Sequence, residues 1–130
     1  MRKEDLIKFW VNSSDMDFKT MQNMFKSKDY HWSLFIGHLV IEKLLKALFV
    51  KANGVNVAVP KIHDLLSLAN RANLVLTEEQ QDILDEITSF NINARYQDYK
   101  LSFYKRCTPK YSNEQKKKIE EIRLWLKKQI

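Results

Sequence analysis

Glycine and proline are nearly absent, because the 130 residues contain only two of each. A β-sandwich or β-barrel needs many tight turns, and tight turns depend on these two residues, so the composition argues against an all-β fold. Apolar residues make up 45% of the chain, and a chain of this length can bury a core without disulfides or metals. We therefore expect a single all-α domain that spans residues 1–130.

Other absences bear on location and chemistry. Cys107 is the only cysteine, so no internal disulfide can form, and no Cys/His cluster has the spacing of zinc ligands. The first residues, MRKEDLIKFW, lack the apolar segment of a signal peptide, and no apolar run is long enough to span a membrane. Gly-rich phosphate loops and the common hydrolase motifs are missing as well. We expect a cytoplasmic protein with no membrane contact, no metal and no cofactor.

The net charge of +6 is concentrated at the C-terminal end. Residues 1–99 contain 12 basic and 13 acidic side chains (net −1), whereas residues 100–130 contain 10 basic and 3 acidic ones (net +7). One interpretation is a solvated Lys-rich helix that aids solubility. The other is a surface for an anionic partner, either nucleic acid or an acidic protein face.

Hydrophobic periodicity indicates four to five helices in an up-and-down antiparallel bundle. The predicted helical segments are residues 3–28, 29–53, 64–72, 77–94 and 112 onward. Poor helix formers at residues 12–15 allow a break or kink in the first segment. Residues 101–111 are predicted to be irregular and to end at Pro109.

The predicted helix ends rest on capping residues. Asp29 and Asp64 are expected N-caps, and Gly54 is expected to stop the second helix. Thr77 with Gln80 fits a capping box, in which each side chain satisfies the other residue's backbone N–H. Ser112 with Gln115 fits the same pattern and is expected to open the last helix.

The second predicted helix is apolar nearly all round. At about 100° per residue, only a narrow arc with Lys43 and Lys46 is clearly polar. Such a helix must be covered on nearly every side, and a small bundle covers one side. A second subunit is the simplest cover for the other side, so we expect a homodimer.

Three polar features lie in otherwise apolar segments. Glu42 falls within the apolar face of the second helix, where His38 and Lys46 can serve as its i,i+4 partners; the alternative is an edge position with a surface salt bridge. The His63-Asp64 pair precedes a short helix and fits a helix cap, because a metal or acid–base role lacks a third partner in the sequence.

The third feature is the run from Asn91 to Tyr99, where apolar periodicity gives way to donors, acceptors and aromatic rings. Arg95 can hold a phosphate or carboxylate through two hydrogen bonds, and Tyr96 or Tyr99 can stack on a base. Alternatively, Arg95 pairs with Glu42 and ties two helices together. This structural role does not preclude ligand binding nearby.

Three motifs together resemble the HEPN domain family (higher eukaryote and prokaryote nucleotide-binding). They are EKLLKA at residues 42–47, HDL at residues 63–65 and ARYQD at residues 94–98, and the similarity extends from Trp10 to the last helix. The resemblance implies a dimeric helical bundle, often encoded beside a small nucleotidyltransferase in a toxin–antitoxin-like module. Many members are metal-independent ribonucleases that use an Arg followed, after four to six residues, by a His. Others, including the branch that this chain most resembles, bind nucleotides or partners without cleaving RNA.

The resemblance places the family's Arg at Arg95, a preceding polar helix position at Asn91 and the facing acid at Glu42. Where the His is expected, the chain has Lys100, Leu101 and Ser102, and all three histidines lie upstream. Metal-free cleavage needs a group that moves protons near neutral pH, so we predict a domain without catalytic residues. It would bind a nucleotide or RNA, a partner nucleotidyltransferase, or both. The predicted binding residues are Arg95, Asn91, Tyr96, Asp98, Tyr99, Glu42, Lys46 and His38.

Two alternatives remain. One is a divergent metal-independent ribonuclease toxin, in which Arg95 binds phosphate and His38 or a tyrosine moves protons. The other is an RNA-binding accessory protein that acts through the basic segment of residues 100–130.

Overall fold

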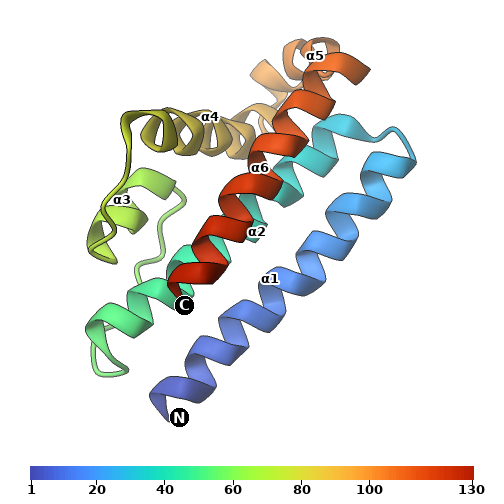
Figure 1. The fold of residues 1–130 in the computed structure, drawn as a ribbon. Helices are drawn as coiled ribbons and strands as arrows, with labels where there is room; N and C mark the ends of the chain where they lie inside the picture. The colour runs from blue at the N-terminus through green and yellow to red at the C-terminus, as the bar shows by residue number, and fades with distance from the viewer.

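The computed structural model describes residues 1–130 and contains helices and connecting loops only (Figure 1). The helices are α1 (Lys3–Lys26), α2 (Tyr30–Asn53), α3 (Leu65–Arg71), α4 (Glu78–Arg95), α5 (Gln97–Arg106) and α6 (Pro109–Gln129). The all-α fold is therefore confirmed, with six helices where four to five were predicted. No helix combines the length and the hydropathy that crossing a lipid bilayer would require.

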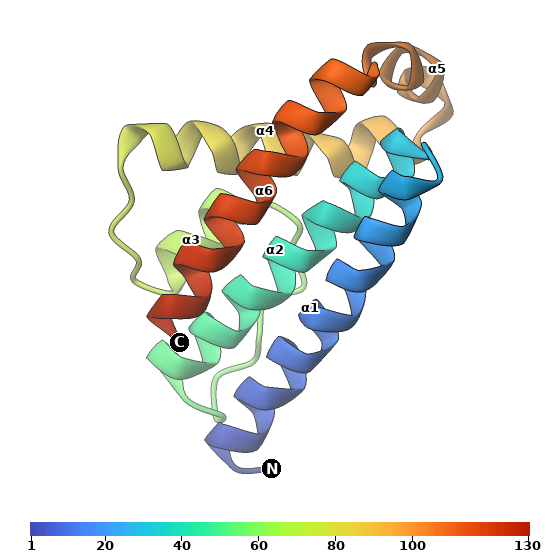
Figure 2. The ribbon, with the colours of Figure 1, turned by 45° about the vertical axis from the view of Figure 1, so that its right-hand side comes forward.

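The central helix of the molecule is α2. It runs antiparallel to α1, while α6 lies along it in the same direction and α4 crosses near its start (Figure 2). The regular up-and-down order therefore holds for α1 and α2 but not for α4 and α6. Fifteen of the 24 residues of α2 are buried within the single chain. The apolar circumference of this helix thus gives no reason for a second subunit, and the homodimer stays a prediction.

Small and hydroxyl side chains let neighbouring helices approach α2 closely. The α1 helix continues unbroken through residues 12–15, where the fully buried Ser14 donates its hydroxyl to the Val40 carbonyl at 2.8 Å. A Cβ atom at Gly37 would lie 2.6 Å from Ile119 Cδ1, so any larger residue there would force the Ile119 side chain of α6 to move. The hydroxyl that weakens helix propensity at Ser14 is therefore satisfied across the helix interface.

Two predicted helix ends in the middle of the chain are confirmed. Thr77 and Gln80 form the capping box of α4 with hydrogen bonds of 3.1 and 3.0 Å. Asp64 caps α3 by accepting a hydrogen bond from the Ser67 N–H at 3.1 Å. Asp29 occupies the N-cap position of α2 without a side-chain cap bond, and Gly54 follows the helix with a φ of 80°.

The prediction for residues 101–111 is wrong, because this segment is helical on both sides of a short link. α5 is held by Phe103, which is buried and stacks on Phe90 at 5.6 Å. Pro109 begins α6 instead of ending an irregular stretch, and Thr108 is the N-cap, accepting from the Tyr111 N–H at 3.2 Å. Proline suits the first helical position because its missing N–H needs no partner there.

The second predicted capping box is also wrong. Ser112 and Gln115 lie inside α6, and both are buried, with exposures of 0% and 4%. The core they border is one cluster of 21 buried residues to which all six helices contribute.

Candidate functional site

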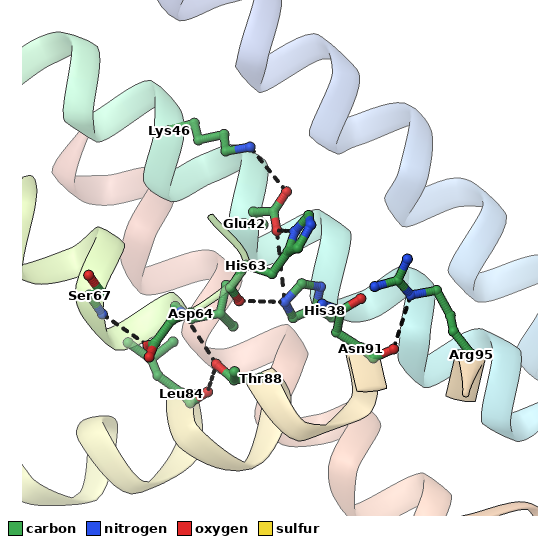
Figure 3. A network of polar contacts seen from close by, with 11 residues as sticks. His38, Glu42, Lys46, His63, Asp64, Ser67, Leu84, Thr88, Asn91 and Arg95 are labelled. Atoms are coloured by element: carbon green, nitrogen blue, oxygen red, sulfur yellow. Dashed lines mark hydrogen bonds and ion pairs between the residues drawn. The ribbon is translucent and has the colours of Figure 1, made fainter. Parts of the chain in front are cut away.

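One face of α2 positions the polar side chains of the site. Its members are spaced by three or four residues and follow a single side of the helix: Trp32, Phe35, His38, Glu42 and Lys46. His38, Glu42 and Lys46 are buried, with exposures of 0%, 4% and 9%. Burying polar groups on a packed face is costly unless each finds a partner. Figure 3 shows these three side chains beside residues from the α2–α3 loop and from α4.

Glu42 is the centre of this network. Its Oε1 atom lies 2.7 Å from His63 Nδ1 and 3.9 Å from His38 Nε2, and its Oε2 atom lies 3.2 Å from Lys46 Nζ. Lys46 is the partner that the i,i+4 spacing predicted, whereas His63 is 21 residues away in the chain. The carboxylate is therefore compensated from two elements, as a buried charge requires. No three His, Cys, Asp or Glu side chains are grouped so that they could hold a metal ion.

His63 is held in place by its own backbone and by the residues that follow it. The buried His38 donates from Nε2 to the His63 carbonyl at 2.9 Å. The Leu65 N–H donates to Thr88 Oγ1 of α4 at 3.1 Å, and Asp64 caps α3. The segment is thus tied to α2, α3 and α4, while the His63 side chain stays 53% exposed. The predicted cap is Asp64 alone, and His63 has a different role.

His38 is a neutral histidine inside the helical core. Burial lowers its pKa more than its hydrogen bond to the His63 carbonyl and the nearby Glu42 charge raise it. Because the carbonyl only accepts, His38 carries its proton on Nε2, and its buried Nδ1 has no hydrogen-bond partner. A residue enclosed in this way is poorly placed to exchange protons with a bound ligand, as the ribonuclease alternative required of it.

Arg95 does not pair with Glu42, so the predicted ion pair between the two helices is wrong. Arg95 is the last residue of α4, and its Nε donates to the Asn91 carbonyl at 3.2 Å. Its guanidinium carbon lies 5.6 Å from the centre of the Phe35 ring and 5.5 Å from that of Tyr96. The acid is occupied by His63 and Lys46, and no carboxylate lies within ion-pair distance of Arg95.

The remaining predicted residues fall around Arg95. Asn91 is buried one turn before it on α4, and Tyr96 follows it directly. Asp98 and Tyr99 are exposed in the first turn of α5. The structure therefore separates the predicted residues into two groups, one around Arg95 and one around Glu42, which meet along the same face of α2 (Figure 3).

A basic and aromatic surface continues from Arg95 along α5. Lys100 Nζ lies 4.7 Å from the centre of the Trp32 ring, and the His31 and Tyr104 rings meet edge to face at 5.2 Å. A pocket of about 300 Å³ opens there. It is lined by Lys28, Tyr30, His31, Tyr104, Lys105 and Cys107. Periodicity did not single out these residues, although the basic excess after residue 99 points to this end of the chain.

Comparison with known protein families gives one match, in which the model of the HEPN domain covers residues 7–129. No curated protein matches the chain, and no solved structure does. The match begins within α1, covers α2 to α6 and includes all three motifs on which the resemblance rests. The chain therefore belongs to the HEPN domain family.

Proposed function

We propose that this HEPN domain binds the phosphates of a nucleotide or of RNA through Arg95. The proposal rests on how few hydrogen bonds the Arg95 guanidinium makes within the chain. Its Nε is fixed on the Asn91 carbonyl, while its two terminal nitrogens have no hydrogen bond or ion pair within the chain. A planar cation held in place with free donors on one edge suits a bidentate contact with phosphate.

The surroundings of Arg95 supply a second kind of contact. Tyr96 and Tyr99 are exposed aromatic rings beside it, and Lys100 follows within one turn of α5. Stacking of a base on an aromatic ring contributes about 1–3 kcal/mol, and it tolerates any base. Aromatic rings interleaved with basic side chains therefore favour a nucleotide or single-stranded RNA over a simple inorganic anion. A HEPN domain is consistent with such a role.

The resemblance supports two further proposals about partners. A small nucleotidyltransferase, encoded next to this chain in a toxin–antitoxin-like module, would be its protein partner, and the domain would act as a homodimer. Co-purification of the chain with the product of an adjacent nucleotidyltransferase reading frame tests the first proposal. Light scattering of the purified chain tests the second, which a strictly monomeric mass would contradict.

Fluorescence anisotropy with a labelled single-stranded RNA and with a labelled adenine nucleotide, both in EDTA, tests phosphate binding. A hydrogen bond to a charged group contributes about 1.5–3 kcal/mol, so Arg95→Ala should weaken binding by about 10- to 150-fold. Arg2→Ala is the matched control, because it removes the same charge from the start of α1, at the opposite end of the molecule from α5 (Figure 1). Equal affinity of Arg95→Ala and the wild type would refute the proposal.

A further inference from the structure

We infer that the ligand of Arg95 is a single strand of RNA about four nucleotides long, bound along the α5 groove. The groove lies between α5 and the start of α2 and is formed by Tyr30, His31, Gln97, Lys100, Tyr104 and Lys105. This inference rests on the proposed phosphate binding by Arg95, and it selects an oligonucleotide over a mononucleotide. Figures 1 and 2 both show α5 beside the link between α1 and α2, where the groove ends.

Two adjoining pockets make up the α5 groove. The pocket nearer to Arg95 has a volume of about 250 Å³ and is lined by His31, Gln97, Lys100, Leu101 and Tyr104. The other is the pocket of about 300 Å³ that ends at Lys28 and Lys105. His31 and Tyr104 line both pockets, and their rings meet edge to face at 5.2 Å, so the two pockets meet at these side chains. Their combined size is in the range of ligand sites, about 300–1,000 Å³.

The spacing of residues in α5 sets the length of the groove. One face of the helix, with i, i+3, i+4, i+7, i+8 spacing, is made of Gln97, Lys100, Leu101, Tyr104 and Lys105. This face is roughly 12 Å long, because its ends are about eight residues apart and each residue adds about 1.5 Å. Phosphates along one stacked strand lie about 3.4 Å apart, so about four nucleotides span the face. A mononucleotide held at the end of α4 would leave the far pocket empty.

Aromatic rings of α2 connect Arg95 to the α5 groove. The Arg95 guanidinium carbon lies 5.6 Å from the centre of the Phe35 ring. The centres of the Phe35 and Trp32 rings are 6.0 Å apart. The Trp32 ring in turn contacts Lys100 Nζ at 4.7 Å and the His31 ring at 5.2 Å. Cations and rings therefore alternate along one continuous surface, as binding of a single strand requires, because phosphates meet the cations while bases stack on the rings.

The lysines of the groove are not neutralised within the chain. Lys28, Lys100 and Lys105 form no ion pair, and no carboxylate lines either pocket. Two basic side chains of α6, by contrast, share the carboxylate of Asp15. Lys28 has a φ of 65°, a conformation that favours glycine, and yet the chain places a cation there. Three uncompensated cations along one groove attract a polyanion.

The middle of the groove suits a base better than a second phosphate. Burial and the nearby Lys100 charge lower the pKa of His31 more than Asp29 raises it, so the imidazole is neutral at pH 7. A neutral imidazole can both donate and accept a hydrogen bond, as the edge of a base does. Tyr104 beside it is 58% exposed and offers a ring for stacking. An acidic peptide would match the lysines but would leave these two rings without a partner, so the groove favours RNA.

A length series tests the inference. AMP and unlabelled oligoadenylates of two, four and six nucleotides compete, in EDTA, with a labelled six-nucleotide strand for the full-length chain, and fluorescence anisotropy reports the displacement. Affinity should rise by at least about tenfold from AMP to the four-nucleotide strand, and the four- and six-nucleotide strands should agree within about threefold. If AMP binds as tightly as the six-nucleotide strand, the inference fails while phosphate binding at Arg95 stands. If no competitor binds, both fail.

A double variant, Lys28→Ala with Lys105→Ala, removes the charge from the far end of the groove. It should weaken binding of the six-nucleotide strand by about tenfold and leave AMP within about twofold of wild type, because AMP reaches only Arg95. The slope of log affinity against log salt for the six-nucleotide strand should become shallower by about 0.7 per lysine. The matched control is Lys3→Ala with Lys8→Ala, which removes two charges from exposed positions at the start of α1 (Figure 1) and should change neither affinity nor slope.

Tyr104→Ala tests the aromatic part of the groove. It should weaken binding of the six-nucleotide strand by about 5- to 150-fold through the loss of one stacked base. Far-UV circular dichroism should show an unchanged fold, because the side chain is largely exposed. A hexaglutamate peptide should not displace the labelled strand. Displacement by this peptide as effective as that by RNA, or wild-type affinity of the Lys28→Ala/Lys105→Ala variant for the six-nucleotide strand, would overturn the inference.

Discussion

Replacing Glu42 by leucine tests whether the buried network is closed as the structure describes. Glu42 and Lys46 are 4% and 9% exposed, and Lys46 Nζ has no other carboxylate within ion-pair distance. Removing one partner of a buried ion pair leaves an uncompensated charge and costs about 3–5 kcal/mol. The Trp10 ring, 5.3 Å from Lys46 Nζ, keeps a cation–π contact of about 1 kcal/mol. The expected loss of unfolding free energy is therefore about 2–4 kcal/mol.

A second variant separates the charge effect from the loss of packing. Glu42→Leu combined with Lys46→Met removes both charges and keeps two side chains of similar volume. Because a buried ion pair contributes little over well-packed apolar residues, the double variant should unfold within about 1 kcal/mol of wild type. A double variant as unstable as Glu42→Leu alone would show that the single variant fails for steric reasons.

Urea unfolding followed by far-UV circular dichroism at neutral pH measures these differences. A loss of about 2–4 kcal/mol is a large part of the 5–15 kcal/mol typical of a domain, so the shift in midpoint is readily detected. The control is Asp5→Asn, which breaks the exposed Arg2–Asp5 pair and should cost at most about 1 kcal/mol. If Glu42→Leu is no less stable than Asp5→Asn, with an unchanged slope, then Lys46 is not a buried partner and the reasoning is refuted.

Three further outcomes are expected. Burial lowers the pKa of His38 in the folded chain, so the unfolded chain binds a proton at His38 more readily, and the free energy of unfolding falls as the pH drops below about 6.5. His38→Asn should reduce this fall, measured as urea midpoints, and an unchanged fall would contradict the assignment to His38. Burial raises the pKa of Cys107 to about 11, so little thiolate is present at about pH 8 and Ellman's reagent should label the folded chain much more slowly than the chain unfolded in urea; equal labelling rates would contradict this. Gly37→Ala should lower the free energy of unfolding by about 1–3 kcal/mol, and with it the melting temperature, because the added Cβ would lie 2.6 Å from Ile119 Cδ1. Combining it with Ile119→Val should restore part of the loss.

Local rules predicted the features of the fold that depend on neighbours in the sequence. The capping box at Thr77 and the cap at Asp64 involve residues three positions apart, and the structure forms both. The same kind of rule failed at Ser112 because Thr108 and Pro109 offer a stronger start four residues earlier. Ser112 instead lies buried inside α6.

The apolar circumference of α2 shows what periodicity alone cannot distinguish. The helix is apolar nearly all round because it lies at the centre of the chain's own helices. A helix wheel counts apolar positions without showing how many elements of the same chain cover them. The contacts between α2 and all five other helices depend on how the later segments fold back, and residue spacing within α2 cannot predict them.

Only part of the candidate site could be predicted, because helical spacing shows contacts within one helix but not contacts between distant segments. The contact between Glu42 and Lys46 follows from helical spacing, so it could be predicted. The contact between Glu42 and His63 depends on the path of the loop after Gly54. Because the sequence shows no third partner near His63 and Asp64, it favours a helix cap at this position instead.

Part of the positive charge of residues 100–130 is paired within the folded chain. Arg123 and Lys127 both contact Asp15 of α1, at 3.1 and 2.9 Å, and Lys116 lies over the Phe25 ring. Part of the positive charge of α6 is thus neutralised within the chain, whereas Lys100 at the start of α5 lies over the Trp32 ring, three residues along α2 from the Phe35 ring that Arg95 contacts. RNA held at that end should therefore release few counterions, and the dependence of affinity on salt should be shallow. Binding along the whole segment would make this dependence steep, because the remaining lysines of α6 would then each neutralise a phosphate.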